Sequence, residues 1–431
     1  MLETMRNAWK IEDLRKKILY TLFILALTRI GSQIPVPFLD PAALAAMVST
    51  TGGIFGYLDV LTGGAFSQST LFALSISPAI TSSIVIQLLT VAIPYLENLA
   101  KEGEEGKRKL QKITRYTTLA LALLQSYAYM TLLNAQGAIR DFDGWQYYFA
   151  RLIIVLSFTA GAMLIMFLCE RIDAKGIGNG ISMILFIGIV SRGGAVVNTM
   201  IQYIKYAMAG YTYYFFAVPL VCVLFLALVA FIIMMTNAER RIPVQYAKRI
   251  VGRKQYGGQS TFIPIKVTMS GVLPIIFAST ILAIPSTIYG FVNPGPDSFL
   301  GKFLSLFHYN TVWYALIYFV LIMGFNYFYI AIQYNPIEIS NNLRKNSGGI
   351  PGIRPGKPTS DYIAKIVSKT TFLGGVFLSI IATLPIVVGA ITRMNISLGG
   401  TSIIIVIGVA LDTVRQLESQ MMMRHYKGFL E

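Results

Sequence analysis

The sequence has few charged residues. Asp, Glu, Lys and Arg make up 13% of its 431 positions, about half of the share that is usual in soluble domains. Hydrophobic residues make up 55%. This balance excludes an ordinary soluble protein and predicts a polytopic membrane protein. Because one span needs about twenty apolar residues, a chain of this length can hold roughly ten spans with short loops.

Cysteine and histidine are also scarce, with two residues of each. Cys169 and Cys222 lie inside apolar runs, and His308 and His425 belong to no metal-binding spacing. The pattern predicts neither a disulfide framework nor a metal site. Both cysteines are interpreted as small apolar core residues, and we expect no metal and no cofactor.

The chain also lacks the groups that do chemistry. It has no Walker motif, so we expect no ATP hydrolysis and no catalytic residue. No predicted span carries a central acidic pair, which ion-coupled transporters usually need. Charged residues near span ends, such as Arg29 and Glu170, are expected to reach the membrane interface by snorkelling. GIGNGI at 176–181 follows a membrane span rather than a strand, so it does not predict dinucleotide binding.

Positive charge is plentiful and unevenly distributed. The formal net charge is +16, while residues 30–100 contain no Lys or Arg. This alternation follows the positive-inside rule, so it predicts cytoplasmic termini and an even number of spans. Most Lys and Arg residues lie in the segment up to Lys17, in 95–115, 171–178, 237–266 and 334–369, and in the tail from Arg415.

Hydropathy predicts ten spans. Two sets of five would have opposite orientations, as in an inverted repeat with a functional site between its halves. The predicted fold is therefore all-α and polytopic, with inverted halves 1–200 and 201–431 and a functional site between them, which the family resemblance described below implies to be a central pore. The predicted spans are 18–35, 71–93, 114–134, 152–170, 180–197, 213–235, 268–291, 311–333, 369–391 and 399–416.

A short segment between the first two spans is unusual. GYLDVLTGGAFSQ at 56–68 is too short and too rich in glycine to cross a bilayer, and the span after it is rich in Ser, Thr and Gln. A weakly hydrophobic half-helix with glycine hinges can leave its place at small cost.

Two predicted cytoplasmic loops, 237–266 and 334–369, are long and basic, and they also contain Gly, Pro and aromatic residues. Topology alone needs only a few charges. Because long loops are often functional, we interpret both as partner-binding surfaces.

Seven motifs, taken in order, resemble the SecY family of protein-conducting channels, and the bacterial form is the most similar. The resemblance runs along essentially the whole chain. The motifs are GYLDVLTGGAFSQ, ISPAITSSIVIQLLTVAIP, GIGNGIS at 176–182, RRIPVQYAKR at 240–249, IPIKVTMSGVLPIIFAS at 263–279, PGIRPG at 351–356 and LGGTSIIIVIGVALD at 398–412.

The resemblance implies a pore with three parts. A plug, 55–67, fills the outer mouth, and an aliphatic ring that excludes water can yield around an extended peptide. A lateral gate between the second and seventh spans includes Ser83 and Gln87. The implied plug residues are Phe55, Gly56, Tyr57, Leu58, Asp59, Val60, Leu61, Thr62, Gly63 and Gly64, and the ring residues are Ile80, Ile84, Leu185, Ile189, Ile276 and Ile405.

The resemblance also implies partners. These are the motor ATPase SecA, the ribosome, the small membrane subunits SecE and SecG, signal peptides, unfolded preproteins and membrane lipid. Arg354 matches the position used for motor coupling. Arg253 and Lys254 match positions that contact the ribosome, where rRNA phosphate attracts basic clusters. Arg240 and Arg241 are further contact candidates.

The function that follows is a channel in the bacterial plasma membrane. It would pass unfolded secretory proteins across the membrane and release membrane helices sideways into lipid. Two alternatives stay open. A secondary transporter of a small solute is compatible with ten spans and inverted halves, and so is an insertase without an aqueous pore.

Overall fold

The structure is a computed structural model. It describes residues 6, 8–40, 59, 62–135, 137–140, 144–209, 212–246, 249–251, 254–256, 260–292, 298–307, 311–392 and 400–427. The chain divides into two compact units. Unit 1 comprises Met1–Val218, Ala283–Asn310 and Thr392–Glu431, and unit 2 comprises Pro219–Leu282 and Thr311–Ile391. The predicted inverted halves are a different division, and that division stays a prediction.

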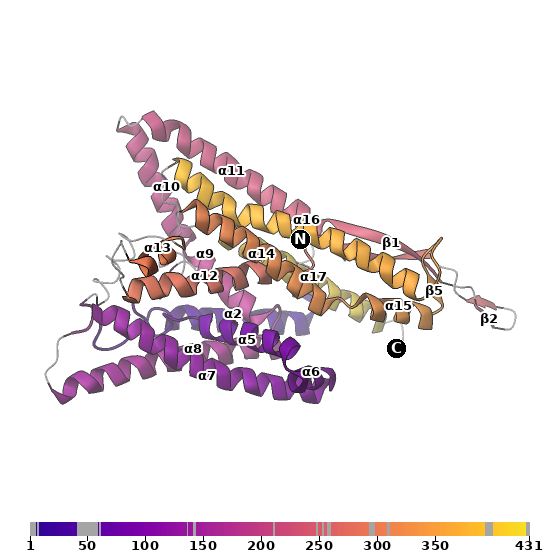
Figure 1. The fold of residues 1–431 in the computed structure, drawn as a ribbon, viewed down its shortest axis with the longest axis horizontal. Coiled ribbons are helices and arrows are strands. Elements are labelled where there is room, and N and C mark those ends of the chain that lie inside the picture. Colours follow the sequence, from indigo (N-terminus) through magenta and orange to yellow (C-terminus); the bar gives the residue numbers. More distant parts are fainter. Residues whose placement is uncertain are drawn as a thin grey trace. The chain divides into compact units, whose positions relative to one another are not determined.

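Helices make up most of the described chain, and their order is shown in Figure 1. In unit 1 they are α2 (Glu12–Gly31), α5 (Ser77–Ala92), α6 (Pro94–Lys101), α7 (Glu104–Ala135), α8 (Trp145–Lys175), α9 (Gly180–Ser191), α10 (Gly193–Met208), α13 (Phe299–Ser305) and α17 (Gly400–Lys427). Unit 2 contains α14 (Val312–Gln333), α15 (Pro336–Lys345) and most of α16 (Lys357–Thr392), while α11 (Thr212–Asn237) and α12 (Leu273–Val292) each contribute to both units.

A helix lies on each of the ten predicted spans, and the all-α polytopic class is confirmed. Within the described residues, five helices are long and apolar enough to cross a membrane. A sixth joins them if α5 and α6, which are bent by 101°, count as one span. The five are Trp145–Lys175, Gly180–Met208, Tyr213–Asn237, Val312–Lys345 and Lys357–Gly389. In this count, α9 and α10 together form one span, and so do α14 and α15.

The second span begins later than the sequence predicts, at Ser77 instead of residue 71. Ser69 and Ser75 before it each have a φ of 48°, a left-handed conformation that interrupts a right-handed helix. Pro78 lies in the first turn of α5, where its missing N–H costs nothing. Residues 71–76 therefore form turns rather than helix.

Small polar side chains join α5, α7 and α8, which lie side by side in unit 1 (Figure 1). The Ser82 hydroxyl donates to the carbonyl of Thr114 at 2.9 Å. Ser126 and Thr159 share a hydrogen bond of 2.9 Å between α7 and α8. Such bonds replace the hydrophobic driving force that lipid does not supply between apolar helices.

The two basic segments predicted as loops are largely ordered structure. Residues 237–266 contain β1 (Glu239–Tyr246), β2 (Arg249–Val251), β3 (Lys254–Tyr256) and β4 (Ser260–Lys266). Residues 334–369 contain α15, β5 (Gly348–Gly349) and the first turns of α16. The strands were missed because a polar, proline-containing segment shows no clear strand periodicity.

The larger sheet has the order β4-β1-β5, with both pairs antiparallel. Along β1, Ile242 and Val244 are buried while their neighbours point outward. They join a core with Ile330 of α14, Leu343 of α15 and Ile363 of α16. The sheet is thus packed onto the helices of unit 2, and the β2–β3 hairpin lies beyond the end of β1 (Figure 1).

Asn326 connects helices inside unit 2. It is 1% exposed, accepts a hydrogen bond of 2.5 Å from the Ser270 hydroxyl and donates one of 2.8 Å to the carbonyl of Thr371. A buried amide in an apolar bundle needs such partners, so this residue links α14 to α16 and to the segment before α12.

The two cysteines differ in environment. Cys169 is buried in α8, as predicted, but Cys222 is exposed on α11, so the prediction of a core residue is wrong there. The exposed face of α11 also carries Phe215, Leu220 and Leu226. An exposed apolar face of this kind suits contact with lipid, where a small apolar thiol is tolerated.

Candidate functional site

The end of the predicted plug, 55–67, and the residues that follow it are firmly embedded in unit 1. Phe66 is buried, and its ring lies 4.8 Å from that of Tyr129, which meets Phe158 edge-on at 4.9 Å. The Tyr129 hydroxyl donates to the carbonyl of Phe66 at 2.6 Å. Two backbone hydrogen bonds add to this: Val36 N–H donates to the carbonyl of Ser69, and Leu71 N–H donates to the carbonyl of Ile34. Residues 65–71 are therefore a fixed base next to α7 and α8.

Two glycines of the predicted plug precede this base. Gly63 has a φ of 67° and Gly64 a φ of 92°, values that residues with a Cβ rarely adopt. A Cβ on Gly63 would lie 2.7 Å from the Ser191 hydroxyl and 2.9 Å from the carbonyl of Gly188. The turn therefore packs directly against the end of α9 and needs glycine there.

Asp59 is the key side chain of the described plug residues. It is fully buried, and its Oδ1 accepts a hydrogen bond of 2.8 Å from the backbone N–H of Ser67. Its Oδ2 forms an ion pair with the Nη2 of Arg192. Arg192 lies between α9 and α10, so the Asp59 carboxylate is paired with a cation from a different part of unit 1.

A second arginine holds the same turn. Arg29, in the last turn of α2, donates from Nη2 to the carbonyl of Gly63 at 3.0 Å. Its guanidinium thus contacts the predicted plug, and the expectation that Arg29 reaches the membrane interface by snorkelling stays a prediction. Glu170 instead receives two hydrogen bonds of 2.7 Å from Arg115 of α7.

Four of the ten predicted plug residues are described, namely Asp59, Thr62, Gly63 and Gly64. Asp59 and Thr62 have helical backbone, and the carbonyl of Asp59 accepts a bond of 2.8 Å from Gly64 N–H. These residues form one compact turn. Phe55, Gly56, Tyr57, Leu58, Val60 and Leu61 lie outside the described residues.

The GIGNG turn at 176–180 joins helices by its backbone. Ile177 N–H donates to Thr21 of α2 at 3.0 Å, and Gly178 N–H donates to Gln416 of α17 at 2.7 Å. Gly180 N–H donates to Asp173 at 2.7 Å. These amides are occupied by side chains of the chain itself, so this turn is a structural joint rather than a phosphate-binding loop.

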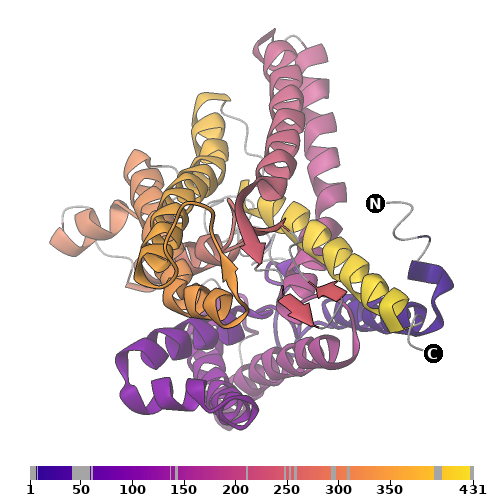
Figure 2. The same ribbon diagram turned by 90° about the vertical axis from the view of Figure 1, so that its right-hand side faces the viewer.

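A small apolar cluster continues the same joint. Leu417 of α17 packs with Ala8, Leu14 and Ile177. Figure 2 shows α17, in yellow, beside the start of the chain, in indigo. The segment around Ala8 and Leu14 is thus packed against α17 within unit 1.

The predicted ring residues are all buried. In unit 1, Ile80 and Ile84 lie on α5, Leu185 and Ile189 on α9, and Ile405 on α17. The helices α9 and α17 pack against each other. Ile276 of α12 is buried within unit 2. Burial is also what ordinary packing would give, so the ring stays a prediction.

Ser83 and Gln87 share one face of α5 with Ile80 and Ile84, because the four residues follow helical spacing. Ser83 is half-buried and Gln87 is exposed. The bond from Ser82 to α7 lies on the other side of the helix. This arrangement leaves the polar face of α5 available for the predicted gate, which stays a prediction.

Arg354 is exposed on a loop that is fixed by contacts with the core of unit 2 and by hydrogen bonds. Ile350 is buried in the core of unit 2, and Ile353 packs against that core. The Thr359 hydroxyl donates to the carbonyl of Arg354 at 2.8 Å, and Ser340 donates to that of Gly356 at 2.9 Å. The guanidinium is therefore presented from an ordered support.

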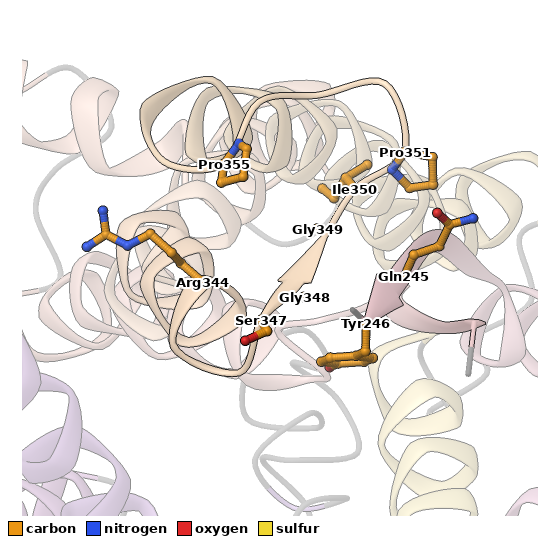
Figure 3. Close-up of a pocket in the computed structure, with 9 residues that line it drawn as sticks. All are labelled: Gln245, Tyr246, Arg344, Ser347, Gly348, Gly349, Ile350, Pro351 and Pro355. Atoms are coloured by element: carbon orange, nitrogen blue, oxygen red, sulfur yellow. The ribbon is translucent and has the colours of Figure 1, made fainter. Parts of the chain in front are cut away.

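A shallow depression lies beside this loop, with β5 running across it (Figure 3). It lies where the end of β1, the end of α15 and the proline-rich loop meet. The residues that line it are Gln245, Tyr246, Arg344, Ser347, Gly348, Gly349, Ile350, Pro351 and Pro355.

The other basic candidates have different surroundings. Arg240 is exposed on β1. The Arg241 guanidinium lies over the ring of Phe262 of β4, 4.7 Å from its centroid, and its Nε donates a hydrogen bond of 2.7 Å to the Glu239 carboxylate. Part of the guanidinium is therefore already engaged within the chain. Lys254 lies in β3, and Arg253 lies outside the described residues.

Comparison with known proteins decides the family. A SecY family model matches residues 70–414. The protein translocase subunit SecY of Mycobacterium tuberculosis (strain ATCC 25618 / H37Rv) is 40% identical over 452 residues, covering all of both chains. The chain belongs to the SecY family. The subunit SecY of Streptomyces coelicolor is 42% identical over 456 residues, again covering all of both chains.

Solved structures of SecY and Sec61 channels share the fold. One of them was described as showing that the plug domain of the SecY protein stabilises the closed state of the translocation channel. Its TM-score is 0.64 at 16% identity. It covers 94% of this chain and 92% of that chain. Sec61 in the canine ribosome-channel complex has a TM-score of 0.62 at 14% identity, with the same coverage.

The SecY motifs predict the plug segment but not the two arginines that contact it, Arg29 and Arg192. A sequence signal for them does exist. Arg29 and Arg192 lie outside the basic clusters, and Asp59 is the single acidic residue between Asp40 and Glu97. Isolated opposite charges in an apolar chain suggest a pair, but the sequence does not say which charges meet.

Proposed function

We propose that this chain is the channel subunit of a bacterial protein translocase. It passes unfolded secretory proteins across the plasma membrane and releases membrane helices into lipid. The observation that carries the proposal is the full-length match to bacterial translocase subunits named SecY. A secondary transporter is not favoured, because the family is one of protein-conducting channels and not of solute carriers.

Within this function, the segment that ends at Gly63 and Gly64 is the plug. The observation that supports this proposal is that two glycines with positive φ join the segment to a base fixed by Phe66 and Tyr129. The aliphatic residues of α5, α9, α12 and α17 form the constriction, and the polar face of α5 forms part of the lateral gate. The charge distribution supports cytoplasmic termini.

The partners are SecE and SecG in the membrane and SecA or a ribosome on the cytoplasmic side. A Sec61 relative is named as part of a ribosome-channel complex. For this chain, support comes from the basic surface built by β1, β5 and the loop 351–356. The sequence contains no Walker motif, so we infer that driving energy arrives by contact and that exposed Arg354 receives it.

The test uses the channel purified with its co-purifying subunits and reconstituted into vesicles. A signal-bearing, unfolded polypeptide should become protected from protease when SecA and ATP are added. Arg354→Glu should reduce this protection steeply, because like charges at an interface can cost several kcal/mol. Insertion by ribosomes should suffer less, because Arg253 and Lys254 are the candidates for that contact.

Lys365→Glu is the matched control. Lys365 is exposed on α16, so this change reverses the same charge on a regular helix outside the loop. Equal loss in both variants would refute a specific role for Arg354. Absence of protected polypeptide with the parent channel, together with uptake of small solutes, would refute the channel function itself.

A further inference from the structure

The buried carboxylate of Asp59 has partners at both oxygens. Ser67 N–H donates to Oδ1 at 2.8 Å, and Arg192 pairs with Oδ2. Asp59 is fully buried, while the Arg192 side chain is 30% exposed. An unpaired charge is costly in a buried place. Removing Asp59 from Arg192 is therefore unfavourable unless water reaches the carboxylate at the same time.

The contact of Arg29 is of a different kind. It binds the carbonyl of Gly63 rather than a side chain, so it holds the backbone of the turn at the hinge. Arg29 comes from α2, and Arg192 comes from the junction of α9 and α10. The segment is thus held at two points, four residues apart, by cations from two separated parts of unit 1.

We infer that Arg192 and Arg29 form a two-point latch that keeps the plug in its closed position, with Arg192 binding Asp59 and Arg29 binding the Gly63 carbonyl. This inference rests on the proposed role of the segment as a plug. The latch sets the free-energy difference between closed and open channel. It thereby determines how strongly a polypeptide must engage the channel before the channel opens.

The latch predicts a gain of activity when it is weakened. A purely structural contact would, when removed, lower abundance or slow normal transport. Loss of a latch should instead raise ion leakage at rest and admit polypeptides with defective signal sequences, while transport of normal substrates is retained. These readouts separate the two roles.

The experiment compares Asp59→Asn, Arg192→Gln and Arg29→Gln in reconstituted channels. Resting conductance in planar bilayers should rise about tenfold in the first two variants, because a tenfold change in an equilibrium corresponds to only about 1.4 kcal/mol. Arg29→Gln should show a smaller rise, since it loses a bond to a neutral carbonyl. Arg192→Lys retains the charge and should stay closer to the parent channel.

Arg115→Gln is the matched control, because it removes an arginine–carboxylate pair of unit 1 that contacts Glu170 and not the plug. Its resting conductance should equal that of the parent. If Arg192→Gln fails to accumulate in the membrane, Asp59→Asn still tests the pair from the other side. Deletion of residues 56–62 serves as the reference for an absent plug.

The outcomes separate the latch from the plug. If the deletion leaks while Asp59→Asn and Arg192→Gln stay closed, the plug assignment holds and the latch is wrong. If the deletion does not leak, the plug role itself is wrong, and the latch with it. A leak from Arg115→Gln as large as that from Arg192→Gln would also overturn the latch.

Discussion

The hydroxyl of Tyr129 donates a hydrogen bond of 2.6 Å to the backbone carbonyl of Phe66, 63 residues earlier in the chain. Both residues are buried, and their rings are 4.8 Å apart. This pair ties the base of the plug to α7. It explains how the segment just after the two glycines is held firmly.

Replacing Tyr129 with Phe should lower the stability of the purified protein. The ring contacts remain, and the carbonyl of Phe66 keeps the hydrogen bond from Ser69 N–H but loses the one from the Tyr129 hydroxyl, at a cost of about 0.5–1.5 kcal/mol. Thermal unfolding in detergent measures the change. Tyr127→Phe is the control, because Tyr127 is 61% exposed on the same helix. Equal destabilisation by both changes would show that the bond contributes little.

Gly63→Ala should impair plug closure more than Gly64→Ala. Both positions have positive φ, which costs about 1–2 kcal/mol for a residue with a Cβ. Only at Gly63 would the added Cβ also collide with the backbone of α9, whereas at Gly64 the nearest atom is 3.6 Å away. Resting conductance of the two channels measures the difference. A larger leak from Gly64→Ala would contradict this account of the turn.

Ile84→Ser should increase ion conductance in a channel whose plug segment 56–62 has been deleted. A hydroxyl in a narrow aliphatic constriction retains water that an isoleucine expels. Ile86→Ser is a close control, because Ile86 is 7% exposed and Ile84 is 5% exposed, on the same helix but on different faces. The ring assignment fails if the two serine variants conduct equally.

Asn326→Leu should destabilise unit 2 by about 0.6–2 kcal/mol, the range found for hydrogen bonds between membrane helices. The change removes the bonds to Ser270 and to the carbonyl of Thr371 while keeping a similar volume. Denaturant unfolding of the purified protein measures the loss. Asn342→Leu, on the exposed side of α15, should have no comparable effect, and an equal effect would argue against the link.

Local sequence determined where the helices lie and several of their ends. Apolar runs of about twenty residues predict spans regardless of their neighbours, and a helix lies on each predicted segment. Asn179 caps α9 by accepting from Ser182 N–H at 3.1 Å, a local preference. The glycines at 63 and 64 likewise adopt positive φ, a conformation that glycine favours because it has no Cβ.

Only the tertiary structure decided which distant groups meet. The basic segments were predicted as loops, but they form a sheet because Ile242 and Ile265 find a hydrophobic core on α14, α15 and α16. Asp59 pairs with Arg192 across 133 positions, counted from their numbers. Hydropathy places a charge in a segment, but its partner depends on how the helices pack. That packing is set by many side chains together rather than by the residues next to the charge.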